Sequence, residues 1–414
     1  MLGALTGEDR RAALVRGQRQ VGKTTLLWQC ADRLLDERWP ARNVTYCDLS
    51  DERVHDPGEV LRALDEEPPS GADPSVPRVL LVDEVGRAPR WADWLKRMVD
   101  TRRHRIIVTD SSAQLLRRGS RESGQGRWDE HLVEGLTFEE FITLRFDTDS
   151  VRDHLAASPD PVELYLAAGA YPEHVRSDDV ATVRRRIRAD IVDRALYRDL
   201  ERLESVVDVS RVADLFAYLV EDSGAIFGAV KRARDFPNPP DQRSLRRWLN
   251  VLCDTLLVYR LPAFAKSATA RARRQARIHA ADAALVVAFA PVAQATLQEA
   301  VRGRAFEAAV FRHLREQTAH RPNAVHYFRD AKDDGLEIDF VVSDQKRHVA
   351  VEVTASRSPR PEKVTRLLRA AQRVGAQRAL LVHGGVSLSR DRQVDLVPLG
   401  EFMLDSARWL EGSS

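Results

Sequence analysis

The chain has 414 residues, of which 43% are hydrophobic and 30% are charged, and this composition excludes an intrinsically disordered protein. Lys and Arg (64) nearly balance Asp and Glu (62), which excludes nucleic-acid binding through overall charge and restricts it to local patches. The three cysteines form no Cys-x-x-Cys pair or Cys/His cluster, so a disulfide framework is excluded and a reducing, cytoplasmic location is predicted.

The length predicts about two to four domains, and the chain falls into three zones. Residues 1–150 alternate short β-type runs with helical patterns, as a parallel sheet with crossover helices requires. Residues 151–300 have an almost wholly helical pattern. In residues 301–414 a helix precedes apolar strand runs and a further helix. We therefore predict an α/β protein with a parallel-sheet domain, a helical domain and a smaller α/β domain.

Four short apolar runs predict the strands of the first zone. They are Ala12–Arg16, Val44–Leu49, Val79–Val82 and Arg105–Thr109. Short apolar runs that alternate with helical patterns are typical of strands buried in a parallel sheet.

The most apolar stretch of the chain, residues 280–297, contains Asp282, Pro291 and Gln294. A membrane-spanning helix needs about 20 predominantly apolar residues in succession. We therefore predict a buried helix here and no association with a membrane. The N-terminus also lacks the basic and apolar regions of a secretory signal.

The strongest chemical signal follows the first predicted strand. The stretch RGQRQVGKTT contains the pattern G-x4-G-K-[ST] of a phosphate-binding P-loop, directly before a helical run. Its glycines let successive backbone N–H groups face the phosphates at the positive end of the helix. We expect Lys23 to reach the β- and γ-phosphates of ATP and the Thr24 hydroxyl to bind Mg²⁺. The residues predicted to bind nucleotide here are Gly17, Gln18, Arg19, Gln20, Val21, Gly22, Lys23, Thr24 and Thr25.

A buried strand ends in an acid pair, Asp83 and Glu84, about 60 residues after the P-loop. Asp83 is predicted to hold the magnesium ion, and Glu84 to orient and deprotonate the attacking water. Taken alone, such a run is more often a strand that ends in a solvated turn. Its distance from the P-loop favours the catalytic interpretation.

The strand Arg105–Thr109 leads into Asp110 and Ser111. Ser111 is a candidate sensor of the γ-phosphate, although a Ser-rich helix cap explains the same residues equally well. Arg127, in the stretch GRW, is a candidate arginine finger, a catalytic cation that offsets charge in the transition state. In a chain so rich in arginine, residue type alone does not single it out.

Together these motifs resemble the prokaryotic AAA-type P-loop ATPases fused to a C-terminal domain of unknown function with winged-helix and PD-(D/E)xK nuclease-like parts. The resemblance covers nearly the whole chain and rests on GQRQVGKTTLL, VDEVGRAPRW, VTDSSAQLL, GRWDEHLVEGLTFEEF, AAGAYPEHV, GRAFEAAV and LEIDFVV with VEVTAS. It implies an ATPase domain at 1–150, a winged-helix domain at 151–300 and a nuclease-like domain at 301–414. Asp110 departs from the family pattern, because such proteins usually carry Gly there.

In the zone that resembles a winged helix, an apolar helix face runs from Leu245 to Leu252. Arg246 and Arg247 lie on or near the other face and are candidate DNA contacts of a recognition helix. A solvated helix that packs against the ATPase domain would show the same pattern. The basic run ARARRQAR adds candidate phosphate contacts at Arg271, Arg273 and Arg274.

In the last zone, Asp339 and Glu352 lie on the predicted strands Ile338–Val342 and His348–Thr354, after Glu307 on a helix. Two paired strands with this spacing place both carboxylates where they are candidate ligands of one metal ion.

By the resemblance, a working nuclease site also needs a lysine two residues after the glutamate, but this position holds Thr354. Without that cation, water activation and charge stabilisation at the phosphate are both weakened. Lys363, on the predicted helix Glu362–Val374, is a candidate substitute. We expect a nuclease-like fold that does not cut DNA.

Three functional hypotheses remain open. The first is an ATP-driven, DNA-associated enzyme with a degenerate nuclease-like domain. The second is a nucleotide-controlled switch that binds a protein partner, and the third is a metal-dependent nuclease that relies on Lys363. DNA-stimulated ATP turnover distinguishes the first from the second. Each hypothesis uses ATP and Mg²⁺, and each is compatible with oligomerisation.

Overall fold

The computed structural model describes residues 11–66, 69–111, 126–148, 150–157, 160–199, 208–265, 267–291, 299–321, 324–330, 333, 336–344 and 347–411. The chain forms two compact units. The first contains residues 1–135, 198–204 and 254–256, and the second contains residues 136–197, 205–253 and 257–414.

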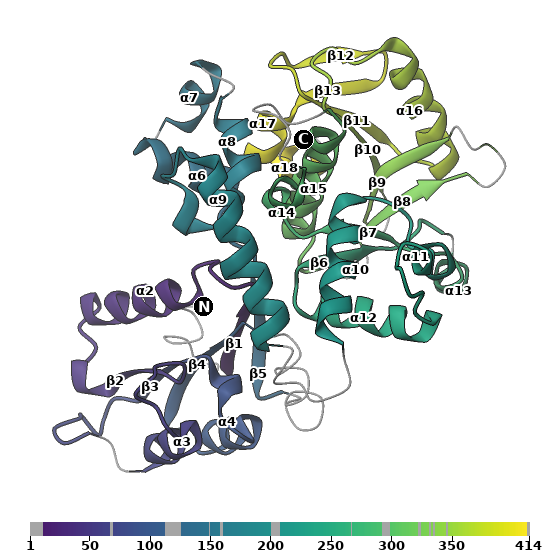
Figure 1. The fold of residues 1–414 in the computed structure, drawn as a ribbon. Helices are drawn as coiled ribbons and strands as arrows, with labels where there is room; N and C mark the ends of the chain where they lie inside the picture. The colour runs from purple at the N-terminus through teal and green to yellow at the C-terminus, as the bar shows by residue number, and fades with distance from the viewer. Residues whose placement is uncertain are drawn as a thin grey trace. The chain divides into compact units, whose positions relative to one another are not determined.

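Five parallel strands form the sheet of the first unit, in the order β2-β3-β4-β1-β5 (Figure 1). They are β1 (Ala12–Gly17), β2 (Val44–Asp48), β3 (Arg78–Asp83), β4 (His104–Asp110) and β5 (Trp128–Val133). The four predicted strands are all present, with ends within a residue of those expected. The sequence did not predict β5, because this edge strand, WDEHLV, has exposed polar residues and no apolar run.

Helices cover both faces of this sheet. Helix α2 (Lys23–Asp36) packs Leu27 and Leu34 against one face, while α3 (Pro57–Asp65) and α4 (Trp91–Asp100) cover the other (Figure 1). Side chains alternate between the two faces along each strand, so successive residues of β3 and β4 face α2 and α4 in turn. The short 3₁₀ turns η1 (Ala41–Asn43) and η2 (Val85–Arg87) complete the unit among its described residues.

Helices dominate residues 136–321 of the second unit. They are α6 (Phe138–Phe146), α7 (Val151–Ala157), α8 (Asp160–Ala168), η3 (Pro172–His174), α9 (Val180–Arg186), a π-helical segment (Ile187–Asp199), α10 (Val209–Glu221), α11 (Ala229–Ala233), α12 (Gln242–Asp254), α13 (Ala268–Ala272), α14 (Ala283–Phe289) and α15 (Glu299–Gln317). Two strands, β6 (Val258–Leu261) and β7 (Arg277–Ala280), form an antiparallel pair within this part. The prediction of an almost wholly helical zone was therefore wrong at these strands, which are too short to show a period.

The buried helix predicted over residues 280–297 is shorter than expected. Ala280 ends β7, and α14 begins only after Asp282, whose carboxylate accepts a hydrogen bond from the Ala284 N–H at 2.8 Å. This side-chain cap fixes the start of the helix. The helix ends at Phe289, just before Pro291, and residues 292–298 lie outside the described residues.

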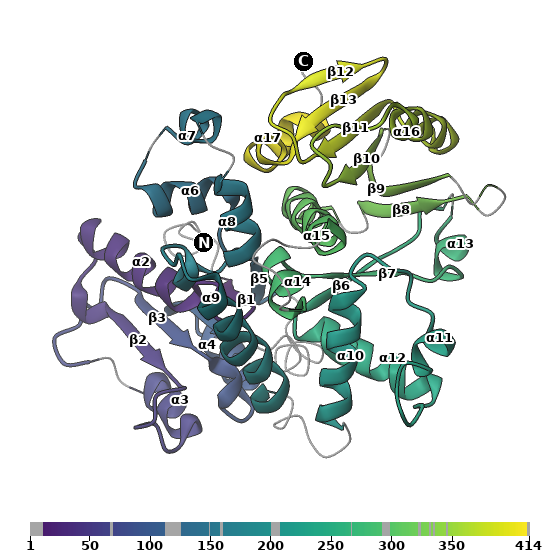
Figure 2. The same cartoon turned by 45° about the horizontal axis from the view of Figure 1, so that its top comes forward.

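A six-stranded sheet in the order β12-β13-β11-β10-β9-β8 forms the C-terminal part of the second unit. Helix α16 packs its apolar side chains on one face, and α15 and α17 lie against the other (Figure 2). The remaining elements are β8 (Val325–Arg329), β9 (Glu337–Ser343), β10 (His348–Thr354), α16 (Pro361–Val374), β11 (Arg378–His383), β12 (Ser389–Asp391), β13 (Val394–Pro398), α17 (Leu399–Leu404) and α18 (Ser406–Glu411).

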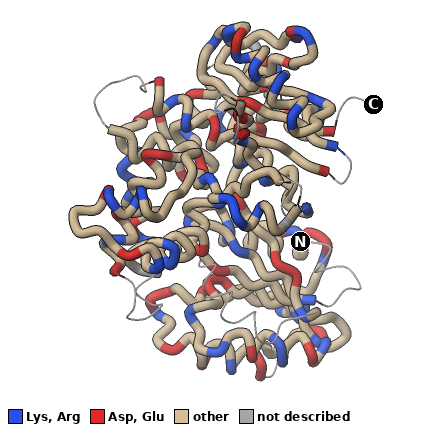
Figure 3. Tube along the Cα trace, turned by 90° about the vertical axis from the view of Figure 1, so that its right-hand side faces the viewer, with Lys and Arg blue, Asp and Glu red and all other residues tan. Residues whose placement is uncertain are grey.

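No described helix is both long and apolar enough to cross a membrane. Lys and Arg are interspersed with Asp and Glu along the described chain (Figure 3). Any surface of one sign must therefore be local.

Candidate functional site

The loop from Gly17 to Gly22 connects the end of β1 to the start of α2. Gly22 has φ 98°, in the left-handed region that favours glycine, and forms the N-cap of α2. At Gly17 a Cβ atom would lie 2.4 Å from the Val133 carbonyl oxygen, so only glycine fits there. Both glycines of the predicted motif are thus required by the backbone, and the loop presents the first N–H groups of α2 as an anion site.

Lys23 is the buried cation of this loop, with 6% of its surface exposed. Its Nζ donates hydrogen bonds to the carbonyl oxygens of Gly17 at 3.1 Å and Gln18 at 2.8 Å. Burial lowers the pKa of Lys23, while the Glu84, Asp110 and Asp83 carboxylates act in the opposite direction. A phosphate group would replace the two carbonyls as the partner of this ammonium group.

Asp83 lies at the end of β3, and its carboxylate accepts hydrogen bonds from three hydroxyl groups. Its Oδ2 accepts hydrogen bonds from Thr24 Oγ1 at 2.5 Å and from the Tyr46 hydroxyl at 3.4 Å. Its Oδ1 accepts one from Thr109 Oγ1. The Thr24 hydroxyl and the Asp83 carboxylate are adjacent hard oxygen donors, and this donor set fits Mg²⁺.

Glu84 directly follows Asp83 and adopts the left-handed conformation, with φ 53°. Non-glycine residues rarely adopt it, and such strain clusters at functional sites. Its backbone N–H donates to Thr109 Oγ1 at 3.2 Å, and Ser111 Oγ donates to both carboxylate oxygens, at 2.8 and 2.9 Å. The structure therefore brings Glu84 and Ser111 together at the sheet edge that carries the P-loop.

The remaining predicted loop residues lie around this centre. Val21 is buried, the Gln18 side-chain amide donates to the Leu256 carbonyl oxygen, and Thr25 is exposed on the first turn of α2. Arg19 and Gln20 continue the loop, and Gln20 has φ 61°.

Arg127 directly precedes β5, at the sheet edge opposite the P-loop. It precedes Trp128, which pairs with Ala12, whereas the P-loop follows Gly17 at the opposite end of β1. Its guanidinium donates to both Asp100 oxygens, at 2.9 and 3.3 Å. Arg127 and the P-loop therefore lie at opposite edges of the sheet, and the role of Arg127 as an arginine finger stays a prediction.

Two residues of the site were missed by the sequence interpretation. Tyr46, on β2, bonds Asp83 and packs against Trp28 of α2, with ring centroids 4.3 Å apart. Asp110 was noted only as a departure from the family pattern. The available signal for Asp110 was its position at the carboxyl end of β4, at the sheet edge that also carries Asp83, whereas Tyr46 lies in the middle of β2 and had no such signal.

A second cluster of charged residues lies in the C-terminal sheet. Asp339 on β9 and Glu352 on β10 occupy neighbouring positions on paired antiparallel strands. Asp339 Oδ1 accepts from Arg277 Nη1 at 3.3 Å and Oδ2 from the Val353 N–H at 3.0 Å. Glu352 Oε1 lies 3.3 Å from Lys363 Nζ, and Oε2 accepts from the Asp339 N–H at 3.3 Å.

All four carboxylate oxygens in this cluster thus have protein donors, and a metal ion would have to displace Arg277 and Lys363. No three His, Cys, Asp or Glu residues in the described part of the chain are grouped to hold a metal ion. The predicted ligands are brought together, but their arrangement does not fit a metal. Burial and the nearby Asp339 carboxylate raise the pKa values of both Glu307 and Glu352, so the cluster resists further negative charge.

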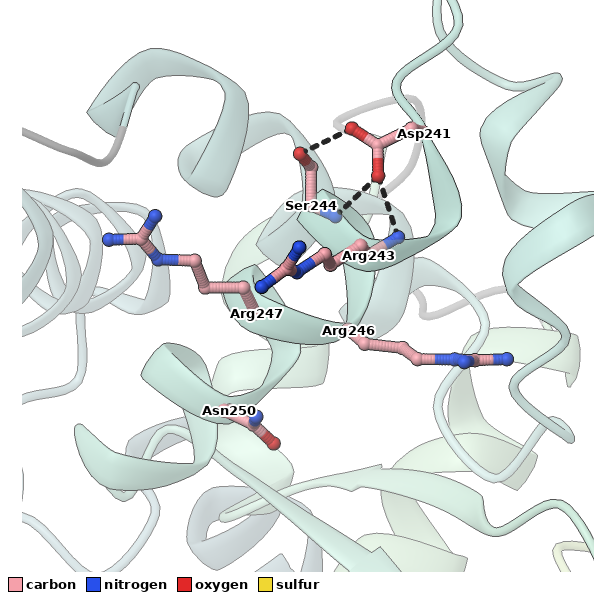
Figure 4. A pocket seen from close by; sticks show the side chains of 6 residues that line it. All are labelled: Asp241, Arg243, Ser244, Arg246, Arg247 and Asn250. Carbon is pink, nitrogen blue, oxygen red and sulfur yellow. Dashed lines mark hydrogen bonds between the residues drawn. The ribbon is translucent and has the colours of Figure 1, made fainter.

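Three exposed arginines, Arg243, Arg246 and Arg247, lie on one side of α12 and line a hollow of about 560 Å³ with Asp241, Ser244 and Asn250. Figure 4 shows the three guanidinium groups extending away from the helix, while Asp241 bonds the backbone N–H groups at its start. The opposite side, including Leu245 and Trp248, is buried. Among the described residues none of the three arginines has a salt bridge, which leaves the face available to an anionic partner.

The other three predicted DNA contacts, Arg271, Arg273 and Arg274, differ from one another in their partners within the unit. Arg271, in α13, contacts His326 Nε2 at 3.0 Å, and Arg274 donates to the Phe264 carbonyl oxygen at 3.5 Å. Arg273 is exposed beside them. The structure brings these three residues together, but two of them already have partners within the unit.

A parallel sheet with a P-loop after β1 and an acid pair after β3 defines a P-loop nucleotide-binding domain. Residues 9–142 match the family model described as an AAA domain, so this part of the chain is similar to AAA-type ATPases. Residues 160–296 match the domain of unknown function DUF8612, and residues 302–402 match the domain of unknown function DUF4143.

Similar proteins occur in bacteria. An uncharacterized protein of Mycobacterium tuberculosis is 25% identical over 86% of this chain and 73% of its own length. One of Haemophilus influenzae is 22% identical over 60% of this chain, and the match spans only 61% of that protein. Among solved structures, a Walker-type ATPase of Pyrococcus abyssi aligns with a TM-score of 0.41 and 17% identity, over 67% of this chain and 90% of its own.

Proposed function

We propose that the first unit binds ATP with Mg²⁺ and hydrolyses it. The observation that carries this proposal is the meeting of Lys23, Asp83 and Glu84 at one sheet edge, with the Thr24 hydroxyl 2.5 Å from Asp83. Thr24 and Asp83 would hold Mg²⁺, which when bound offsets the charge of the β- and γ-phosphates. The measurement that tests the proposal is ATP turnover by the full chain with Mg²⁺, with and without duplex and single-stranded DNA.

In this mechanism Glu84 takes a proton from the attacking water as its oxygen bonds to the γ-phosphorus. The bond from that phosphorus to the β,γ-bridging oxygen breaks, and its electron pair leaves with ADP. Lys23 binds the phosphate oxygens on which the negative charge is spread. Ser111 must release the Glu84 carboxylate to let it reach the water, which is consistent with a γ-phosphate sensor.

We further propose that the second unit binds DNA through the arginine face of α12, in a domain of winged-helix type. Helix α12 and the antiparallel pair β6–β7 supply the helix and the wing of such a domain. Arg243, Arg246 and Arg247, which have no salt bridge within the described part of the chain, favour DNA over a neutral protein partner. DNA-independent turnover would instead favour a nucleotide-controlled switch with a protein partner, in a monomer or an oligomer.

Replacing Arg243, Arg246 and Arg247 together by Ala should weaken duplex binding and lower the slope of log K against log salt by about 2 to 3. The slope falls because each phosphate contact releases condensed counterions. Fluorescence anisotropy with a labelled duplex at several salt concentrations measures it. The charge-matched control removes Arg33, Arg62 and Arg97, which already pair with acids in the first unit. If the control variant lowers the salt slope equally, DNA binds at another surface of the protein.

The C-terminal lobe, which we propose is nuclease-like in fold, should not cut DNA. No cleavage of supercoiled or linear DNA is expected with Mg²⁺ or Mn²⁺, with or without ATP, because Arg277 and Lys363 occupy the Asp339 and Glu352 oxygens. Agarose gels of plasmid incubated with the protein check this. Metal-dependent cutting that is lost in Asp339→Ala and Lys363→Ala would contradict the assignment and make Lys363 a catalytic cation.

A further inference from the structure

Asp110 ends β4 and is almost fully buried, with 1% of its surface exposed. Its Oδ2 accepts a hydrogen bond from the backbone N–H of Gly86 at 2.7 Å. Side chains alternate along β4, and Ile106 and Val108 belong to the cluster on the α4 face of the sheet. Asp110 therefore points to that face, beneath the turn after β3, while Thr109 points to the face of α2 and the phosphates.

Gly86 belongs to the 3₁₀ turn Val85–Arg87, which directly follows Glu84. Because Glu84 is in a strained left-handed conformation, neighbouring groups must hold the turn in place. Thr109 accepts from the Glu84 N–H at 3.2 Å, and Asp110 accepts from the Gly86 N–H. These two bonds, from adjacent residues of β4, fix the peptide before and the turn after the Glu84 side chain.

We propose that Asp110 is a positioning residue for ATP hydrolysis: by binding the Gly86 N–H it fixes the turn that aims the Glu84 carboxylate at the attacking water. This inference rests on the proposed ATPase function. Asp110 acts on hydrolysis through the turn that carries Glu84, and its carboxylate also acts to raise the pKa of Lys23. A carboxylate acceptor forms a stronger bond to an N–H group than a neutral amide does, so the charge of Asp110 contributes to the rigidity of the turn.

Asp110→Ala should lower kcat for ATP about 10- to 100-fold and leave KM and the nucleotide Kd within about threefold, since misplacing a reacting group by about 1 Å costs up to about 10²-fold. Asp110→Asn keeps the size and a weaker acceptor, and should lower kcat by about three- to tenfold. Asp36→Asn, the same change at an exposed position of α2, is the matched control. Retained nucleotide binding shows that each variant is folded.

A double substitution separates positioning from general support of the fold. If Asp110 acts only through Glu84, adding Asp110→Ala to Glu84→Gln should not lower the residual rate further. A further drop of tenfold or more, or a wild-type kcat in Asp110→Asn, would overturn the proposal while leaving the ATPase assignment intact. A wild-type chain that binds ATP but never hydrolyses it would overturn both.

Discussion

Glu84→Gln should slow ATP hydrolysis by about 10²- to 10³-fold and leave ATP bound, because the amide cannot accept the proton of the attacking water. Gln keeps the size of Glu and can still accept the Ser111 hydrogen bond, so the local structure should be preserved. Thr24 and Asp83 are untouched and keep the magnesium-binding oxygens. Single-turnover hydrolysis and a titration with a fluorescent ATP analogue, made on the same sample, measure the two effects.

Lys23→Ala should fail at the binding step in the same assays, whereas Glu84→Gln should bind ATP without hydrolysing it. It removes the ammonium group that lies between the Gly17 and Gln18 carbonyls, so nucleotide binding itself should be lost. Arg62→Ala, at an exposed position of α3, controls for the loss of one positive charge. Wild-type turnover by Glu84→Gln, or unchanged affinity in Lys23→Ala, would contradict the assigned roles.

The P-loop and the acid pair could be predicted because their chemistry depends on local sequence. A glycine pattern before a helix and an apolar run that ends in two acids each require neighbours in the chain only. The same reasoning located β1, β3 and β4, whose apolar runs are largely buried, and the half-buried edge strand β2. It missed β5, a polar edge strand, and β6 and β7, which have four residues each, and it also predicted no strand at β8, β12 or β13.

What the sequence could not establish at the site concerns residues whose position depends on strand register. Arg127 was a candidate arginine finger by residue type alone, and the register places it just before β5, at the edge opposite the P-loop. Asp110 was noted only as a departure from the family pattern, although it bonds the turn that carries Glu84. Lys363 approaches Glu352 from another element, as the sequence allowed, but Arg277 beside Asp339 was not anticipated.

Two stretches that supported the family resemblance are explained by packing within the second unit. The stretch AAGAYPEHV contains Ala170, whose N–H donates to Asp282 Oδ2 at 3.3 Å. Helix α15, which carries GRAFEAAV, continues to Arg312, which is 1% exposed. The Arg312 guanidinium donates to the Tyr165 hydroxyl at 2.7 Å and lies 3.7 Å from Asp282 Oδ2. These contacts join the end of α8, the start of α14 and the middle of α15.

Arg312→Ala should therefore destabilise the second unit by about 3–5 kcal/mol, the usual cost of removing one partner from a buried ion pair. The loss is large because burial raises the pKa of Asp282, which is 4% exposed, and without the Arg312 cation this side chain must either carry an uncompensated charge or take up a proton. Urea unfolding followed by circular dichroism measures it. Arg321→Ala is the matched control, because Arg321 pairs with Asp344 at 3.5 Å on the surface, where such a pair contributes less than about 1 kcal/mol.

A double substitution tests whether the uncompensated charge is the cause. Arg312→Met fills much of the space of the side chain but leaves Asp282 unpaired, so it should also destabilise the unit. Adding Asp282→Asn removes the charge and keeps an amide near the Ala170 and Ala284 N–H groups, so it should restore most of the lost stability. If the double variant is as unstable as Arg312→Met alone, or if Arg312→Ala costs no more than Arg321→Ala, the stabilising role of this ion pair is disproved.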